Sequence, residues 1–467
     1  MRAFLCAGLA AAMTSCSPFA LRQAQGDAMG AALPARDAGA KRATSRIPIQ
    51  HIVLVIQENR SFDDFFSTFP NADGTAGGYM ENPSGTGDEY VPLQKVDLVG
   101  ACDFGHSYRT VAIDYDGGKM DGFDLEGGGK KCPGAVGTKV YQYVDPTQLA
   151  PDWSIAQQYV LADHLFQTQG SGSFTAHQDL IAGSTLINQP KNTQSLVDFP
   201  SLRPWGCDAP PGTVTSLLVV RKGHVREEYQ HGPFPCLTYP TLRDLLDAKY
   251  VSWKYYSPPE PYGTGSLWNA FNAIQAVREG PEWKTNIART NVFFSDVTNG
   301  TLPSVSWIVP ENPDSDHPGN HSDTGPSWVA SIVNAVGASS YWQSTAVVIV
   351  WDDWGGLYDH EPPPFFDKWG GLGFRVPMMI VSPYARRTNP SQPGYVSHTQ
   401  YEFGSILKFM EEVWGLGTLG TTDQRANSII DCFNFAQPPH AFAAIRAKYS
   451  RSYFLHRPPS YLPVDTE

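Results

Sequence analysis

The feature that most constrains the fold is an apolar run that ends in two adjacent acids. Residues 346–351 read Ala-Val-Val-Ile-Val-Trp, and Asp352 and Asp353 follow at once. A run this rich in β-branched residues predicts a central strand that is buried on both faces of a sheet. In open α/β sheets, ligands bind beyond the carboxyl ends of such strands. Two neighbouring carboxylates there repel each other, and a bound cation is the usual remedy.

A second strand end of the same kind lies far upstream. Residues 51–56, His-Ile-Val-Leu-Val-Ile, predict another buried strand, and Gln57, Glu58 and Asn59 follow it. Glu58 and Asn59 offer the hard oxygen ligands that suit a divalent metal. Taken alone, this pair is more often a capped turn. The two strand ends together, one with Glu-Asn and one with Asp-Asp, favour a metal shared between them.

Strand and helix patterns alternate along the chain, which predicts an α/β layer structure with a mostly parallel sheet. Residues 185–240 carry many Pro, Gly and polar residues with little periodicity, which favours an insertion or lid over an independent domain. The predicted strands are 51–56, 158–162, 214–220, 251–256, 290–294, 304–309, 345–351 and 376–381. The predicted helices are 147–158, 175–184, 240–248, 266–278, 326–337 and 400–414.

Composition narrows the class of ligand. The chain has 467 residues, and its 12 Trp, 21 Tyr and 24 Phe argue for a large ordered core. Its formal charge of −12 disfavours nucleic-acid binding, since no basic stretch would neutralise phosphates. A small phosphorylated substrate stays compatible with this charge, because a local cation overrides the global field.

The N-terminus reads as an export signal. Arg2 precedes the apolar residues 3–13, which predicts a signal peptide over residues 1–16. Thr-Ser-Cys16 resembles the end of a bacterial lipoprotein cleavage box, so a lipid anchor at Cys16 and ordinary cleavage remain two alternatives. Residues 17–45 predict a flexible tether, and residues 46–467 a single domain. The expected location is therefore periplasmic, outer-membrane lipoprotein or secreted.

Five cysteines remain after the signal region, in keeping with an exported chain. We expect disulfides between Cys102 and Cys132 and between Cys207 and Cys236, each closing a loop rich in Gly or Pro. Cys432 is then left over, and we expect it to be a buried free thiol.

Two motifs resemble a known family. Residues 56–63, Ile-Gln-Glu-Asn-Arg-Ser-Phe-Asp, resemble the N-terminal motif of the bacterial and plant phosphoesterases, which include non-specific phospholipases C and a class of acid phosphatases. Residues 351–360, Trp-Asp-Asp-Trp-Gly-Gly-Leu-Tyr-Asp-His, resemble the closing motif. The resemblance runs from about Ile47 to the C-terminus. It implies a three-layer α/β sandwich similar to alkaline phosphatases and sulfatases, and one metal held by Glu58, Asn59, Asp352 and Asp353.

The expected nucleophile is a hydroxyl on the turn before residue 175. Residues 169–174 place two glycines and two serines before a helical pattern. A hydroxyl there lies beside free backbone N–H groups at a helix N-terminus, which favour an alkoxide and a phosphoryl oxygen. Contact with the metal would lower the hydroxyl's pKa further. Ser171, Ser173 and Thr175 are the candidates.

The family resemblance selects among them. In the family the nucleophile stands two residues before a Pro-Asn-Arg run, and that position is Ser173 here. Residues 175–177 read Thr-Ala-His instead, so the substrate contact of that run falls to His177. Ser171 and Thr175 remain alternative nucleophiles. Ser173 is also expected to contact the metal.

Five further histidines are candidates for the site. His106 lies in an early Gly-His pair, and His317 and His321 lie in residues 314–323, after a third apolar strand pattern. The resemblance implies phosphate contact and protonation of the leaving group by His106, His317 and His321, tasks that suit a histidine near neutrality. His360 is expected to orient Asp352 or Asp353 from outside the metal shell. His398 either supports the site or starts the last helix.

These observations predict a metal-dependent hydrolase of phosphate esters that works through a phosphoseryl intermediate. The ion is calcium, magnesium or manganese. The preferred substrate is the phosphodiester of a phospholipid, as for a phospholipase C, and an acid phosphatase acting on monoesters is the alternative. A non-catalytic surface lipoprotein is a further alternative, supported by the altered residues 175–177 and opposed by the intact acidic pairs. The sequence leaves the oligomeric state open.

Overall fold

The computed structural model describes residues 47–81, 87–100, 102–126, 136–189, 193–221, 224–258, 268–364, 366–367, 369–389 and 394–462. The expected signal peptide, the tether and the anchor at Cys16 lie outside these ranges, and so does Cys132. None of the helices within them is both long and apolar enough to cross a membrane.

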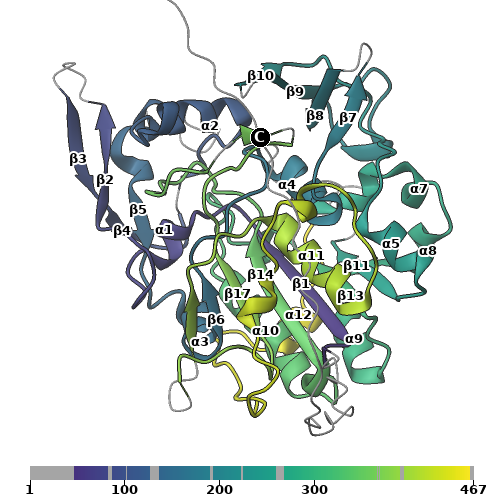
Figure 1. Ribbon diagram of the computed structural model, residues 1–467. Helices are drawn as coiled ribbons and strands as arrows, with labels where there is room; N and C mark the ends of the chain where they lie inside the picture. The colour runs from purple at the N-terminus through teal and green to yellow at the C-terminus, as the bar shows by residue number, and fades with distance from the viewer. Residues whose placement is uncertain are drawn as a thin grey trace, which may run out of the picture. The chain divides into compact units, whose positions relative to one another are not determined.

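An eight-stranded sheet forms the centre of the fold (Figure 1). The order of strands across the sheet is β12 (Ile287–Arg289), β11 (Trp253–Ser257), β13 (Val305–Ile308), β1 (His51–Gln57), β14 (Thr345–Trp351), β17 (Met378–Val381), β6 (Val160–Ala162) and β18 (Tyr395–Ser397). Every neighbouring pair is parallel except those made by β17, which runs antiparallel to both neighbours.

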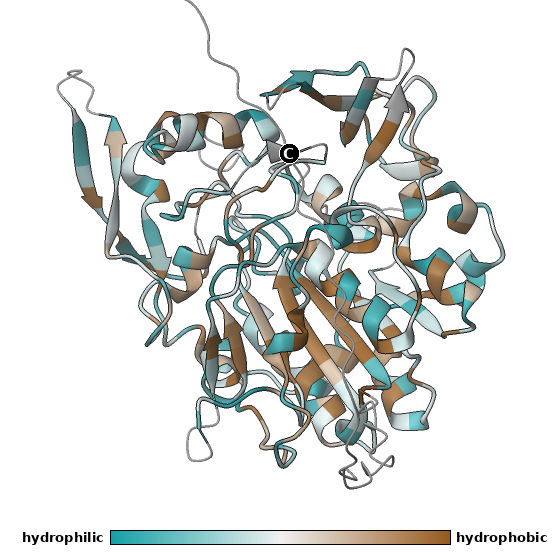
Figure 2. Ribbon diagram, viewed as in Figure 1, coloured by the Kyte–Doolittle hydropathy of each residue, from teal (hydrophilic) through white to brown (hydrophobic). Residues whose placement is uncertain are grey.

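The central strands are buried on both faces. Every residue of β14 is buried, as are all residues of β1 after the first. Because successive side chains point to opposite faces, this burial requires cover on both sides of the sheet. Figure 2 shows these strands as the most hydrophobic part of the ribbon. The alternation of strands and helices and the mostly parallel sheet confirm the predicted α/β sandwich.

The helices pack in two groups. In one, α4 (Ser173–Ala182) contacts α11 (Phe403–Trp414) and α5 (Leu242–Ala248). In the other, α10 (Gly325–Gly337) contacts α3 (Ala150–Gln158), α9 (Val292–Asn299) and α12 (Arg451–His456). The short helix α1 (Phe62–Phe66) follows the loop after β1. The helix α2 (Tyr108–Tyr115) follows a loop that ends at residue 107.

Residues 185–240 contain a small antiparallel sheet. Its order is β10 (His224–Glu228), β9 (Thr215–Arg221), β8 (Thr193–Pro200) and β7 (Leu186–Gln189). Of these strands only β9 was predicted, because polar residues obscure the alternation in the others. The expected disulfide between Cys207 and Cys236 is present, with a Cα–Cα distance of 4.3 Å. Cys432 is a buried free thiol, as expected.

Two predicted elements differ from the structure. Residues 290–294 were predicted as a strand and instead begin helix α9. Phe293, Phe294 and Val297 are buried at helical spacing, and a short apolar run does not distinguish the two structures. The predicted helix 266–278 is broken into a 3-10 turn (Ala270–Ala273) and the short α7 (Gln275–Arg278).

Candidate active site

The carboxyl ends of β1 and β14 meet at one edge of the sheet. The two strands are parallel neighbours, with Gln57 opposite Trp351, so the residues after each strand start side by side. Asn59 has a φ of 54°, a left-handed conformation that Asn tolerates better than most residues. Its backbone N–H donates to Asp352 Oδ1 at 3.0 Å. The strand ends predicted to converge therefore do so.

The turn after Asp353 needs a glycine. Gly355 has a φ of 65°, and a Cβ at this position would lie 2.4 Å from the carbonyl oxygen of Asn59. Two backbone N–H groups each fix one carboxylate oxygen of the acids. The N–H of Asp353 donates to Asp352 Oδ1, and the N–H of Gly355 donates to Asp353 Oδ1, both at 2.8 Å. Asp352 Oδ2 and Asp353 Oδ2 are thereby left facing the other site residues.

Ser173 is the first residue of α4, and its hydroxyl lies against the two strand ends. It donates to Asp353 Oδ2 at 3.0 Å and accepts from Asn59 Nδ2 at 3.3 Å. The alternative hydroxyls, Ser171 and Thr175, both donate to Asp198 on β8 instead. Of the three candidate hydroxyls, only Ser173 has a described bond to the predicted metal ligands.

His177 lies one helical turn after Ser173 and points to the same cluster. Its Nε2 lies 2.9 Å from Glu58 Oε1 and 3.6 Å from Asp352 Oδ2. All three side chains are fully buried. Asp352, Glu58 and His177 form a group whose ligand atoms lie close enough to share one metal ion.

The site concentrates buried negative charge. Burial and the nearby charge of Asp352 raise the pKa of Glu58 well above its usual value. The same two causes raise the pKa of Asp353 to about 8. Burial lowers the pKa of His177 to about 4, so its imidazole is neutral at pH 7 and adds no compensating charge. A cation between the carboxylates would stabilise their ionised forms.

Three oxygens are placed to hold that cation. Glu58 Oε2, Asn59 Oδ1 and Asp352 Oδ2 are buried and have no hydrogen-bond partner among the described residues. Buried polar atoms rarely stay unpaired in folded proteins. Carboxylate and amide oxygens are the ligands that hard divalent cations take. The residues present therefore fit a bound divalent metal.

Two histidines line the same cluster. His106 Nδ1 lies 2.9 Å from the carbonyl of Phe104, which accepts its proton, and His106 Nε2 accepts from Asn59 Nδ2 at 3.1 Å. The rings of His106 and His317 meet edge to face with centroids 5.9 Å apart. His317 Nδ1 donates to the carbonyl of Pro318 at 2.7 Å, which fixes the orientation of the ring. Both are 2% exposed or less.

The loop that carries His317 is held by residues after β1. The Gln57 side chain donates to the carbonyl of Asp314 at 3.1 Å and accepts from the N–H of Asp316 at 3.2 Å. Arg60 Nε donates to the carbonyl of Asp316 at 2.6 Å, and its guanidinium pairs with Asp64 at 3.0 Å. Sequence reasoning did not assign these roles to Gln57 and Arg60, although both stand within the N-terminal motif.

Three of the expected histidines lie elsewhere. His321 is exposed, and none of its described contacts joins it to the buried cluster. His360 bonds to Asp63 at 2.7 Å and not to Asp352 or Asp353, because the turn at residues 355–356 carries the chain away from the acids. His398 bonds to Asp163 Oδ2 at 2.7 Å and is 59% exposed.

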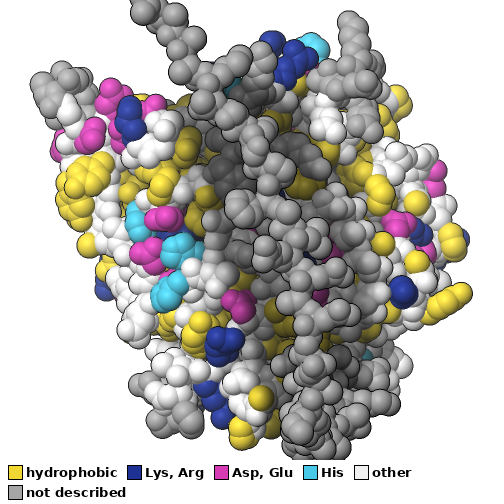
Figure 3. Space-filling view, in the orientation of Figure 1, with side chains coloured by type: hydrophobic (Ala, Val, Ile, Leu, Met, Phe, Trp, Pro, Cys, Tyr) yellow, Lys and Arg dark blue, Asp and Glu magenta, His cyan; other side chains and the backbone are white. Residues whose placement is uncertain are grey.

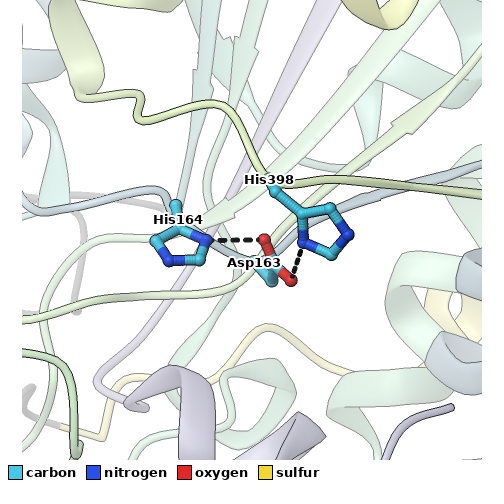
Figure 4. Close-up of side chains that lie close together, drawn as sticks. All are labelled: Asp163, His164 and His398. Carbon is cyan, nitrogen blue, oxygen red and sulfur yellow. Dashed lines mark hydrogen bonds and ion pairs between the residues drawn. The ribbon is translucent and has the colours of Figure 1, made fainter. Parts of the chain in front are cut away.

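Asp163 joins two histidines near the molecular surface. His164 Nδ1 lies 2.8 Å from Asp163 Oδ1, and His398 lies on the other carboxylate oxygen (Figure 4). Asp163 and His398 follow β6 and β18, so they stand at the same edge of the sheet as the candidate site. Figure 3 shows histidine and acidic side chains side by side on the viewed face.

A pH dependence of stability follows from His360. Burial opposes a charge on this imidazole, but the bond to Asp63 and the charges of Asp63 and Asp359 together outweigh burial and raise the pKa of His360 to about 9 from 6.5. Charged His360 therefore stabilises the fold fully below about pH 6.5, and the contribution is lost as pH rises through about 9. His360→Gln should flatten the fall in the free energy of unfolding over that range by on the order of 2 kcal/mol. Urea titrations at each pH measure it.

The exposed His456 supplies the control for this experiment, because His456→Gln should leave the profile unchanged. An equally steep decline in the His360→Gln protein would contradict the assignment.

The geometry places a serine beside a cluster of buried acids at the carboxyl edge of the α/β sheet. Residues 49–417 match the model of the Phosphoesterase family, so the chain belongs to this family. It is a phosphoric ester hydrolase.

Two proteins that are similar in sequence are both named as phospholipases C. Phospholipase C A of Mycobacterium tuberculosis is 27% identical over 453 residues, covering 84% of this chain and 78% of the relative. Non-specific phospholipase C3 of Arabidopsis thaliana is 24% identical, covering 83% of this chain and 76% of the relative. A Vibrio parahaemolyticus structure in the alkaline phosphatase superfamily is 9% identical with a TM-score of 0.35, covering 82% of this chain and 72% of that one. The family assignment rests on the sequence matches.

Proposed function

We propose that the protein cleaves phospholipids as a phospholipase C, with Ser173 as the nucleophile. The observation that carries the proposal is the contact of the Ser173 hydroxyl with Asp353, inside a cluster of buried acids with unpartnered oxygens. Glu58, Asn59, Asp352 and Asp353 would hold one divalent cation. When bound, that cation polarises a phosphoryl oxygen and favours the ionised serine.

The chain's own residues account for the remaining steps. Ser173 Oγ attacks phosphorus, and its proton leaves toward Asp353 Oδ2, which already accepts it at 3.0 Å. The bond between phosphorus and the glycerol oxygen breaks, and His317 donates a proton to that oxygen. Diacylglycerol departs and leaves the phosphorylated head group on Ser173. Water then attacks phosphorus and gives one proton to His317, the bond between phosphorus and Ser173 Oγ breaks, and Asp353 returns its proton to the serine as the phosphorylated head group departs.

Asn59 and His106 position this chemistry. The amide of Asn59 donates toward Ser173 and Asp353 and to His106 Nε2, so one side chain fixes the nucleophile and the histidine together. His106 and His317 stand next to each other, and we assign both to contact with the phosphoryl group. His321 is exposed in the structure, and a substrate role for it stays a prediction from the family resemblance.

An apolar cavity favours a lipid substrate over a soluble monoester. Its volume is about 130 Å³, and its wall includes Gln169 and Gly170 from the loop that precedes Ser173. Val111 of α2 and Leu218 and Val225 of the insertion sheet line it with apolar surface. Cavities lined this way bind apolar ligands. We therefore assign the cavity to the start of an acyl chain.

Filling the cavity should separate lipid from soluble substrates. Val225 is half-buried, so Val225→Trp should place an indole in the cavity without disturbing the core. We expect kcat/KM for a long-chain phosphatidylcholine to fall about tenfold or more, since each methylene left in water forfeits roughly 0.8 kcal/mol. Hydrolysis of p-nitrophenyl phosphorylcholine should change little. Arg226→Trp, on the opposite face of the same strand, is the matched control.

Equal losses on both substrates would contradict the lipid assignment. Turnover of p-nitrophenyl phosphate that exceeds turnover of every diester would identify an acid phosphatase instead. Bound metal without turnover of any ester would favour a binding protein.

A further inference from the structure

His177 occupies a position that is better explained by metal contact than by substrate contact. It lies on α4 four residues after Ser173, and its ring is fully buried. Its Nε2 faces Glu58 Oε1 at 2.9 Å and Asp352 Oδ2 at 3.6 Å, two of the residues that would hold the cation. The same carboxylates carry unpartnered oxygens in Glu58 Oε2 and Asp352 Oδ2.

The other ring nitrogen has a partner that can accept a proton. The Tyr255 hydroxyl lies 3.5 Å from His177 Nδ1 and donates its one proton to the carbonyl of Trp268 at 2.5 Å. The tyrosine oxygen can therefore only accept from the imidazole, so a proton on Nδ1 has a partner there. With the proton on Nδ1, the lone pair of Nε2 is directed at the two carboxylates.

A lone pair beside two carboxylate oxygens is unfavourable unless a cation lies among them. Histidines that bind metals usually donate their second N–H to a fixed oxygen, which orients the ring. Tyr255 supplies that oxygen here, and the Trp268 carbonyl holds Tyr255 in turn.

We propose that His177 is a direct ligand of the metal, so that this centre combines one nitrogen with its oxygens and prefers a transition ion such as zinc over calcium or magnesium. The proposal rests on the metal centre of the proposed function. Imidazole favours zinc, iron and nickel, whereas carboxylates and carbonyls alone suit calcium, magnesium and manganese. His177 thereby changes the expected metal without changing the nucleophile.

Among the described residues, three groups besides the candidate site could bind a metal ion, and each must lose a histidine before the measurement. Two of these groups share His360. Asp163, His164 and His398 lie together near the surface with ligand atoms close to one another (Figure 4). Both carboxylate oxygens of Asp163 already accept hydrogen bonds, from the two histidines and from the N–H of Asp73. The experiment therefore uses the protein with both His360→Gln and His398→Gln as its reference, which loses one histidine of each of these groups.

Manganese provides the direct test, because it binds oxygen sites whether or not His177 is a ligand. The reference protein is loaded with one equivalent of Mn²⁺, and electron spin echo envelope modulation measures coupling to ¹⁴N. We expect the coupling of a directly bound imidazole. His177→Gln should abolish it, and His106→Gln should retain it. The glutamine can still donate to Glu58, so it preserves a merely structural hydrogen bond.

Calorimetric titration supplies the second readout. We expect His177→Gln to weaken zinc binding at least about 100-fold and calcium binding less than about threefold. Bound manganese without nitrogen coupling in the reference protein overturns the inference and leaves the proposed function intact. Coupling that survives in His177→Gln but not in His106→Gln also overturns it. Failure of any divalent ion to bind would reject both proposals.

Discussion

Ser173→Ala is expected to lower kcat/KM for any phosphate ester at least about 1000-fold, because the variant has no oxygen to attack phosphorus. Ser173 is 3% exposed, and removal of its hydroxyl leaves no large cavity, so the fold and the thermal unfolding midpoint should be retained. Initial rates on a lipid and on p-nitrophenyl phosphorylcholine, with circular dichroism on the same samples, make the measurement.

The neighbouring hydroxyls supply matched controls. The hydroxyls of Ser171 and Thr175 donate to Asp198 of the insertion sheet, and neither has a described bond to Asp352 or Asp353. Ser171→Ala and Thr175→Ala should therefore keep most of the turnover. A Ser173→Ala protein with near-normal rates, or a larger loss in Thr175→Ala, would reject the assigned nucleophile.

Glu58→Gln is expected to be more stable than the parent chain without metal and less stable than the parent with metal, so that metal binding reverses their order of stability. Burial and the charge of Asp352 raise the pKa of Glu58, so its ionised form destabilises the metal-free fold at neutral pH. Without metal the variant should melt at a higher temperature than the parent chain. With metal at 100 times its dissociation constant the parent gains about 2.7 kcal/mol, and the variant gains little. Activity should fall at least about 100-fold.

Differential scanning calorimetry with chelator and with saturating metal tests this reversal. Glu361→Gln provides the control, since Glu361 lies beyond the acids on a half-buried segment and should respond to metal as the parent does. A Glu58→Gln protein that gains as much from metal as the parent would exclude Glu58 as a ligand.

The convergence of the strand ends was predictable because it follows from the sheet. Residues 52–56 and 346–351 are unbroken apolar runs, and parallel neighbours place their carboxyl ends at one edge. Residues 290–294 were misassigned, because three apolar residues in a row fit a strand and a helix equally. The insertion strands other than β9 were missed because polar residues obscure their alternation.

The contacts between histidines and acids were less predictable than the acids themselves. His360 stands eight residues after Asp352, yet it bonds to Asp63 at the start of α1, together with Arg375. Such pairing depends on how the turn at residues 355–356 directs the chain, and sequence spacing does not encode that direction. His177 was expected at the substrate, whereas its helical spacing from Ser173 brings it to Glu58.

An anomalous-scattering map of crystals soaked in Mn²⁺ tests the shared metal centre most directly. We expect one dominant peak within bonding distance of Glu58, Asn59, Asp352 and Asp353, next to Ser173 Oγ. A strong peak only at Asp163, His164 and His398, with none between the two strand ends, would contradict it.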